Sequence, residues 1–287
     1  MTIALPRSET EVAANSATLA VAPPPGASTG ILLPAFSLWL REITRFYRQR
    51  ARIVSFVAAP LLFWLVMGSG FGTSFHSGNA PGQRHYLNYF YPGALVMIVL
   101  FTSVFTMMSV IEDRKQGFLL SVLVAPVPRS AIVLGKVLGG TTLAGIQGVI
   151  FLLFAPLAGV DTSVIYFLLA VVVIFVVSFA LTALGFAIAW PMDSNQGFHA
   201  VINLVLIPLW LLSGAVFPLT GASGWVRAAM WVNPLTYGVE ALRILLYPAM
   251  PAPFPLVDSL ATLVLFALAM FGLSFVMVSR RTTRLPA

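Results

Sequence analysis

The sequence predicts an all-α membrane protein with six transmembrane helices, and three observations support this fold class. Hydrophobic residues make up 59% of the 287 residues and charged residues only 9%, with a mean hydropathy of +0.95. Soluble domains usually contain roughly 25% charged residues. Six apolar runs approach the roughly 20 residues that a helix needs to cross the hydrocarbon core. The short alternating segments of a membrane barrel do not occur in the sequence.

The predicted spans cover about residues 53–72, 89–111, 137–159, 164–190, 198–217 and 256–279. They belong to one membrane domain, residues 31–287, and residues 1–30, rich in Ala, Ser, Thr and Pro, are predicted to be a disordered cytoplasmic tail. Lys136 is placed to extend from the end of the third span toward the interface. No Asp, Glu, Lys or Arg is predicted deep in a span, which disfavours an ion-coupled carrier.

Residues 35–52 show helical periodicity with an apolar face and a basic face. The apolar face comprises Phe36, Trp39, Leu40, Ile43, Phe46 and Tyr47, and the basic face comprises Arg41, Arg45, Arg48 and Arg52. A basic amphipathic helix with aromatic residues is typical of the membrane surface, where it meets anionic lipid head groups. We therefore expect an N-terminal interfacial helix. The alternative is a surface helix on a soluble lobe.

The segment from Glu112 to Lys136 is a charged connection between the second and third spans. Its first part, residues 112–124, is expected to form a short cytoplasmic helix across the membrane surface. Leu119, Leu120 and residues 122–124 would face the bundle, and Pro126 and Pro128 would end the helix before Arg129. The alternative is a solvated loop.

The same segment is predicted to be the surface through which a partner outside the membrane drives the membrane domain. The candidate contact residues are Glu112, Asp113, Arg114, Lys115, Gly117, Phe118, Pro126 and Arg129. The charges at 112–115 are expected to steer docking, because rim charges act mainly on association. Phe118 is expected to be the buried centre of the contact, since a few well-packed residues usually dominate an interface. Its alternative role is membrane anchoring.

The basic residues predict the orientation of the chain. With six spans, all of the 16 Lys and Arg except Arg84, Arg227 and Arg243 lie on one side. The positive-inside rule therefore places both termini and the 112–136 segment in the cytoplasm. We expect a multi-pass protein of the plasma (bacterial inner) membrane.

Residues 218–255 are too long for a turn and too apolar for a plain loop. They are predicted to form two short re-entrant outer helices, Trp225–Trp231 and Leu235–Tyr247, separated by Asn233 and Pro234. Glu240 and Arg243 are three residues apart and lie on one helix face. Because leucines surround them, we expect a partly buried ion pair; a solvated pair is the alternative.

Sequence motifs for chemistry are absent. The chain has no G-x-x-x-x-G-K-[ST], no H-E-x-x-H, no G-x-S-x-G and no cysteine. No enzyme activity, metal or bound cofactor is expected, and no nucleic-acid partner, because the basic residues flank apolar runs. Gly140, Ala144 and Gly148 recur at four-residue spacing, which permits close helix packing or, alternatively, a dimer interface.

Several short motifs resemble the permease subunits of type-2 ABC exporters, the group that handles drugs, lipo-oligosaccharides, polysaccharides and teichoic acids. The matching stretches share their order along the chain and are residues 112–117 (EDRKQG), 125–129 (APVPR), 135–136 (GK), 212–218 (LSGAVFP) and 233–237 (NPLTY), with Glu240 and Arg243. The likeness covers about residues 35–280. One departure is Phe118-Leu119-Leu120, where the family often has Thr-Leu-Glu.

The resemblance implies a homodimer bound to two copies of a separate cytoplasmic ABC ATPase, which would hold ATP and Mg²⁺ while this chain binds no cofactor. It implies export of a substrate out of the cytoplasm or inner leaflet, and the apolar pathway suits a hydrophobic or lipid-linked molecule. The alternatives are a stand-alone channel or secondary carrier, and a membrane-bound enzyme.

Overall fold

A computed structural model describes residues 30–48, 50–70, 86–125, 127–250 and 252–280. These ranges contain helices and no strands, so the all-α class is confirmed for them. In chain order the elements are α2 (Leu32–Tyr47), α3 (Arg50–Gly70), α4 (Tyr86–Thr106), α5 (Met108–Lys115), α6 (Phe118–Val124), α7 (Arg129–Leu152), the 3-10 turn η1 (Ala155–Ala158), α8 (Val164–Ala189), α9 (Asn195–Leu211), η2 (Leu219–Gly221), α10 (Gly224–Val232), α11 (Pro234–Leu246) and α12 (Leu256–Arg280). The predicted tail at 1–30 lies outside the described residues except for Gly30.

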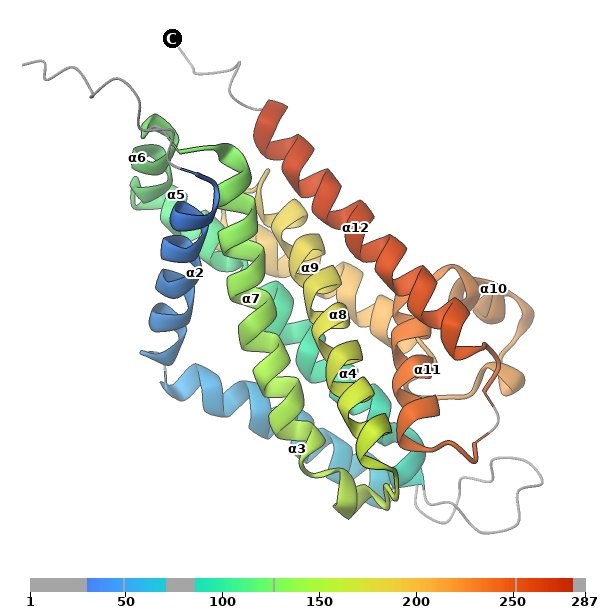
Figure 1. Ribbon diagram of the computed structural model, residues 1–287. Helices are drawn as coiled ribbons and strands as arrows, with labels where there is room; N and C mark the ends of the chain where they lie inside the picture. The colour runs from blue at the N-terminus through green and yellow to red at the C-terminus, as the bar shows by residue number, and fades with distance from the viewer. Residues whose placement is uncertain (1–29, 49, 71–85, 126, 251, 281–287) are drawn as a thin grey trace, which may run out of the picture.

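Helix α4 is the centre of the bundle (Figure 1). It contacts α3, α7, α8, α9 and α11. The most apolar stretch of the helix formed by α4 and α5 is 83% buried, whereas that of α12 is only 22% buried. A helix that is apolar on all sides is expected to be enclosed, and α12 instead leaves most of its surface for lipid.

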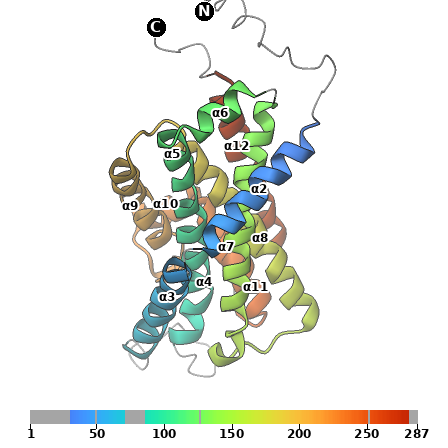
Figure 2. The ribbon, with the colours of Figure 1, turned by 90° about the vertical axis from the view of Figure 1, so that its left-hand side faces the viewer.

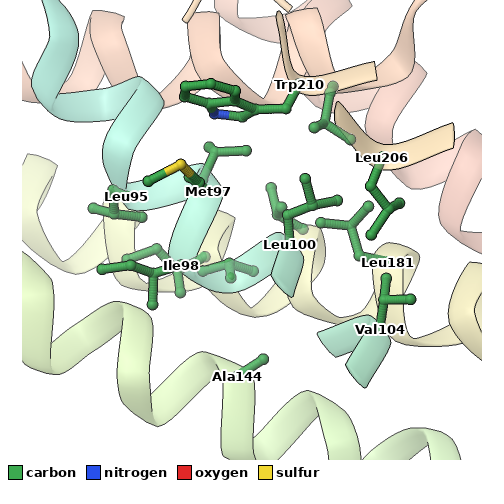
Figure 3. Packing of buried hydrophobic residues seen from close by; sticks show 14 of the residues in the cluster. Leu95, Met97, Ile98, Leu100, Val104, Ala144, Leu181, Leu206 and Trp210 are labelled. Atoms are coloured by element: carbon green, nitrogen blue, oxygen red, sulfur yellow. The ribbon is translucent and has the colours of Figure 1, made fainter. Parts of the chain in front are cut away.

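The core around α4 is built from aliphatic and aromatic side chains of four helices. Figure 3 shows Leu95, Ile98 and Leu100 of α4, with Leu100 next to Leu181 of α8 and Trp210 of α9 above them. All of these aliphatic side chains are fully buried. The Trp210 indole N–H also donates to the Gly93 carbonyl at 2.9 Å, so α9 is fixed to α4 by a polar contact within the apolar core.

Four of the described helices are long and apolar enough to cross a membrane. These are α4 with α5 (Tyr86–Lys115), α7, α8 and α12. Helix α9 and the described apolar part of α3, Pro60–Gly70, are shorter, so length and composition support four of the six predicted spans. The third span is also shifted: α7 begins at Arg129 because extended Pro128 precedes it, and it ends at Leu152.

The predicted helix over 112–124 is two helices that meet at a bend. Helix α5 ends at Lys115, Gly117 has a φ of 74°, and α6 begins at Phe118. A left-handed backbone at this position favours glycine, because a Cβ would approach the following carbonyl. The prediction for the inward face was wrong for most of its residues: within α6 only Leu119 is buried, while Leu120 and Val124 are 62% and 82% exposed.

Helix α2 packs on α7 with the side that carries Ala35 and Glu42, which leaves much of the predicted membrane-facing side exposed (Figure 2). Its buried residues are Ala35, Leu38, Glu42 and Phe46, whereas Phe36, Leu40 and Tyr47 are exposed. The reason is the pair Gly135 and Gly139 on α7. A Cβ at Gly135 would lie 2.6 Å from the Ala35 carbonyl oxygen, so only glycine permits this approach.

The remaining glycines of α7 face other helices of the same chain. A Cβ at Gly140 would meet Thr182 of α8 and Met107, and one at Gly148 would meet Ile174 of α8 and Val99 of α4. Ala144 is buried among the core residues in Figure 3. The stripe at 140, 144 and 148 therefore serves packing within the chain, and the alternative of a dimer interface through it is not supported.

Candidate functional site around Asp113

Asp113 on α5 is the centre of a buried cluster of charged side chains. It is 0% exposed and accepts hydrogen bonds from both terminal nitrogens of Arg41, at 2.7 and 2.6 Å. Arg45 donates to the same carboxylate at 3.0 Å, and Lys136 completes the set. Two-point arginine–carboxylate pairs are among the strongest hydrogen-bonded contacts in proteins. The hydrogen bonds with Asp113 raise the pKa of Arg41, while partial burial acts in the opposite direction.

Lys136 joins α7 to this cluster. Its ammonium donates to Glu42 at 2.5 Å, to Ser109 at 3.0 Å and to Asp113. The side chain is 1% exposed. The prediction that Lys136 extends toward the interface was therefore wrong. Lys136 and Asp113 lie toward the ends of the candidate spans Arg129–Leu152 and Tyr86–Lys115. The charged partners of Lys136 lie on α2 and α5, so they could not be identified from spacing along α7.

The cluster is balanced in charge. It contains the acids Glu42, Glu112 and Asp113 and the bases Arg41, Arg45 and Lys136; Glu112 pairs with Arg45. A buried charge is costly unless it is paired and hydrogen-bonded. Opposite charges supplied by α2, α5 and α7 thus hold these three helices at one junction. The charges at 112 and 113 are consequently turned toward the protein.

Arg114 extends from the same helix toward the end of α8. One terminal nitrogen donates to the Trp190 carbonyl at 2.5 Å; the other donates to the Met192 carbonyl at 3.0 Å and to Asp193 at 2.9 Å. Carbonyls at a helix C-terminus lack intrahelical donors and carry partial negative charge. Arg114 therefore caps α8 and connects α5 to the turn that leads into α9.

The outer surface of α5 and α6 offers a different set of residues. Phe118 is half-buried, packs against the core and lies under the Arg41 guanidinium, 3.6 Å from its ring centroid. Such cation–π contacts fix both partners. Lys115, Leu120 and Val124 remain exposed. Of the predicted contact residues, Lys115 and Gly117 therefore face solvent, and Phe118 is partly engaged within the chain.

The end of the candidate segment is attached to the last helix. Arg129, the first residue of α7, donates to the Ser279 carbonyl of α12 at 3.0 Å. Both views place α6 and the C-terminal end of α12 at the same end of the bundle (Figures 1 and 2). Pro126 lies outside the described residues. The 112–129 segment thus touches α2, α7, α8 and α12.

The predicted outer helices form a second polar site, on the side of the bundle opposite α2 and α5 in Figure 1. Helices α10 and α11 are present and Asn233 separates them, accepting from the Leu235 N–H at 2.9 Å. Pro234 begins α11 at a position where a missing N–H costs nothing. The Asn233 side chain also donates to the Leu209 and Leu212 carbonyls at 2.6 and 2.9 Å, fixing the end of α9.

Glu240 and Arg243 form an ion pair that is fully inside the protein. They are 3% and 5% exposed, which confirms the predicted burial. Arg243 also donates to the Gly214 carbonyl at 2.8 Å, and the Tyr89 hydroxyl donates to the same oxygen at 2.9 Å. The guanidinium lies 4.4 Å from the Tyr89 ring centroid. The pair therefore joins α11, α4 and the turn after α9.

Comparison with known proteins decides the family. The profile described as "ABC-2 type transporter" matches residues 35–247, from α2 to the end of α11. This chain belongs to the ABC-2 type transporter family. The permease is 29% identical over 213 residues to the "Putative transport permease ycf38" of Cyanophora paradoxa, covering 73% of each chain. It is 24% identical over 225 residues, 78% of each chain, to the "Daunorubicin resistance ABC transporter permease protein DrrB1" of Streptomyces coeruleorubidus.

A further relative of this ABC-2 permease is the "Inner membrane transport permease YadH" of Escherichia coli K12. The two are 25% identical over 252 residues, which is 85% of this chain and 94% of the relative. Proteins of this family are membrane components of transporters. The chain is therefore a transmembrane transport permease, in agreement with the resemblance inferred from the motifs.

Sequence reasoning missed Glu42 as a site residue of the permease. Two features of the sequence could have indicated its contact with Lys136. Glu42 is the one acid in the arginine-rich helix, and Gly135 and Gly139 lie on either side of Lys136. Within the described residues no group of three or more His, Cys, Asp or Glu side chains is placed to hold a metal ion. The charged residues at this site join helices to one another.

Proposed function

We propose that this permease is the membrane subunit of an ATP-driven exporter for a hydrophobic or lipid-linked substrate. In this proposal it works as a homodimer with two copies of a separate cytoplasmic ATPase, which binds ATP and Mg²⁺. Membership in the ABC-2 family and similarity to a permease named for daunorubicin resistance support it. Helices α3 and α9 complete six spans, with both termini and α6 in the cytoplasm.

The observation that carries the proposal is the two-sided arrangement of the 112–129 segment. Its inner side is bound to α2 and α7 through Asp113 and to α8 through Arg114. Its exposed residues include Leu120 and Val124 of α6 and Lys115 at the end of α5. Exposed apolar residues with a charged rim are typical of protein interfaces. We assign this outer side as the ATPase-docking face.

Such an arrangement suits mechanical coupling. A force applied to α6 acts on α5 across the Gly117 bend, and α5 is held to three neighbouring helices by charged contacts. Movement of the docked ATPase on binding ATP would then shift these helices together. ATP can drive transport only if the ATPase with ATP bound favours one permease state over the other.

Matched substitutions test the docking face. Val124 on α6 and Val232 on α10 are 82% and 84% exposed. Leu120→Ser/Val124→Ser should weaken ATPase association about tenfold or more, as for interface residues that dominate binding, while Val232→Ser should leave it unchanged. Association is measured on the purified complex with its ATPase subunit. Transport by the permease alone, with no accompanying ATPase, would instead identify a channel or secondary carrier.

The proposed orientation has a separate test, because the chain has no native cysteine. Ser121 on α6 is exposed and can be replaced by cysteine. In intact cells an impermeant thiol reagent should leave Ser121→Cys unlabelled and should label it once the membrane is permeabilised. Labelling in intact cells would refute the cytoplasmic placement of α6.

A further inference from the structure

Helices α7, α8 and α12 form an apolar groove that the docking proposal does not use. Its volume is about 450 Å³. At the end of the bundle that carries α6, α7 and α12 are joined, because Arg129 donates to the Ser279 carbonyl at 3.0 Å. Toward the opposite end the two helices diverge, with α8 between them (Figure 1). The groove therefore lies in the angle of a V, whose arms are α7 and α12 and whose floor is α8.

The described lining of the groove carries no charge and no side chain in need of a hydrogen bond. It consists of Thr141 of α7 and eight apolar side chains of α8 and α12. The Thr141 hydroxyl donates to the Val137 carbonyl of its own helix at 2.7 Å, so it is satisfied without a ligand. A buried water needs two or more polar partners, and apolar cavities stay dry. The chemistry of the lining therefore calls for a hydrocarbon group.

The position of the groove along the helices places it deep in the hydrocarbon core. Val264 and Leu268 of α12 are exposed side chains that line it. At 1.5 Å per residue, Val264 lies about 12 Å from the first residue of α12 and Leu268 about 18 Å from the last. A polar head group is costly at such a depth. The tail of a lipid can reach the groove while its head group stays at the membrane surface.

The volume of the groove distinguishes between apolar occupants. A helix with its side chains is about 10 Å across, so two turns of a neighbouring helix would fill about 800 Å³, nearly twice the groove. One benzene ring fits an apolar cavity of about 150 Å³, so by proportion the groove has room for about 18 carbon atoms. This is the size of one acyl chain. A second copy of the chain could not insert a helix here without opening the V further.

The floor of the groove is held in place by its neighbours. Phe175 and Phe179 lie one turn apart on α8. A Cβ at Gly145 of α7 would lie 2.4 Å from the Phe175 ring, so glycine at this position lets the ring pack directly on α7. The Phe179 ring packs against Phe271 of α12, with the centroids 5.4 Å apart. Contacts within the chain thus fix both rings, and the floor exists before any ligand arrives.

We propose that this groove binds one acyl chain of a membrane lipid, inserted from the leaflet opposite α6, which is the outer leaflet in the proposed orientation. The chain fills the angle between α7 and α12 and supplies the dispersion contacts that an empty groove would lack. Because the lining meets only the chain, the head group does not decide binding. The two arms meet at the α6 end, so the groove is a binding site and not a passage. The proposal is independent of the transport function.

The test uses the purified full-length permease in detergent, with phosphatidylcholine that carries a photoactivatable diazirine in the middle of one acyl chain. After illumination, the intact mass should show saturation at one lipid per chain. Peptide mapping should place the adduct on groove residues such as Val172 of α8 and Val264 of α12. Excess unlabelled phosphatidylcholine and phosphatidylglycerol should displace the probe equally, because the lining is uncharged.

A pair of tryptophan substitutions provides the matched control. Val172→Trp fills the groove from a side chain that is 58% exposed, so it leaves the core of the bundle intact. It should lower the yield of adduct about tenfold, the effect of losing roughly ten carbon–carbon contacts. Leu265 of α12 is 70% exposed and lies outside the described lining, so Leu265→Trp should label like the parent. Size-exclusion chromatography checks that both variants are folded.

Four results would overturn the proposal. Adducts as frequent at Leu265 as in the groove would indicate a general lipid layer without a defined site. Equal labelling of Val172→Trp and Leu265→Trp would show that the groove is not where the chain binds. Displacement by only one of the two lipids would assign binding to the head group. Absence of any lipid adduct, together with a disulfide between two copies of Val172→Cys, would assign the groove to a second copy of the chain.

Discussion

Lys136 on α7 and Asp113 on α5 form an ion pair in which neither side chain is more than 2% exposed. Glu42 of α2 shares the same ammonium, so three helices meet at one positive charge. Removing one partner of a buried pair leaves an uncompensated charge, whereas removing both can be nearly neutral. This asymmetry makes the junction a place where single and double substitutions give different results.

Lys136→Met should destabilise the permease by about 3–5 kcal/mol, because Glu42 loses its main partner. That loss corresponds to a fall in apparent melting temperature on the order of 10 °C in detergent. Glu42→Gln/Lys136→Met should recover part of it. Lys115→Met, an exposed neighbour of the same segment, should change stability by less than about 0.5 kcal/mol. Equal melting temperatures for Lys136→Met and Lys115→Met would contradict a stabilising role for the cluster.

Substitutions at Gly117 should lower stability through backbone strain and not through a clash of the new side chain. A Cβ there would meet nothing within 4 Å, yet the φ of 74° is left-handed. Gly117→Ala should therefore cost about 1–2 kcal/mol, and Gly117→Asn should cost less because asparagine tolerates this conformation. Gly272→Ala, in open space within α12, should be neutral or slightly stabilising. Thermal unfolding of the three variants, ranked in this order, checks the prediction; equal effects of Ala and Asn at 117 would count against it.

Much of the outer site was accessible from the sequence. Glu240 and Arg243 are three residues apart in one apolar helix, so their pairing follows from helical periodicity alone, and Asn233-Pro234 is a helix-start signal in its own right. The helices themselves follow from long apolar runs. These features depend on residues that are close together in the sequence, so they could be predicted without knowing the tertiary structure.

The inner cluster could not be predicted in the same way. Glu42 and Lys136 are 94 residues apart, and their contact exists only because Gly135 and Gly139 let α2 approach α7. The separation of α2 into apolar and basic faces assumed lipid on one side and water on the other. The helix also has a third neighbour, the surface of α7 at Gly135 and Gly139, which contacts the side with Ala35 and Glu42 and leaves Phe36 exposed. Phe118 was assigned to a partner because the guanidinium above its ring comes from a distant helix.

Glu240→Gln should lower folded yield and transport, because Arg243 would stay buried with a neutral partner. The expected loss is about 3–5 kcal/mol. Glu240→Gln/Arg243→Gln should recover only part of this, since Arg243 also donates to Gly214 and stacks on Tyr89. Arg227→Gln on exposed α10 serves as the control. Yield is measured by size-exclusion chromatography of the detergent-solubilised protein; single and double variants that both match the control would show that the pair is not needed for folding.

The side chains of the adjacent residues Arg114 and Lys115 point to opposite sides of the segment. Substituting each in turn therefore distinguishes a role in coupling from a role in ATPase docking. Arg114 donates inward to the carbonyls of Trp190 and Met192, while Lys115 faces solvent on the proposed docking side. Arg114→Gln removes the contact between α5 and the end of α8 without altering the outer surface. We therefore expect the ATPase to remain bound, while stimulation of ATP hydrolysis by substrate, and transport itself, fall by about tenfold.

Lys115→Gln should have the complementary effect, because rim charges act mainly on association rate and salt dependence. Its complex should form more slowly at low salt, yet hydrolysis in the complex should stay coupled to transport. Asp193→Asn distinguishes the ion pair of Arg114 with Asp193 from its hydrogen bonds to the Trp190 and Met192 carbonyls. Asp193 is 85% exposed, and such surface pairs contribute roughly 0–1 kcal/mol. Loss of this pair should therefore change coupling little. If Arg114→Gln weakened ATPase binding as much as Lys115→Gln does, both residues would belong to the docking face, and transmission from α5 to α8 would have to run through another contact.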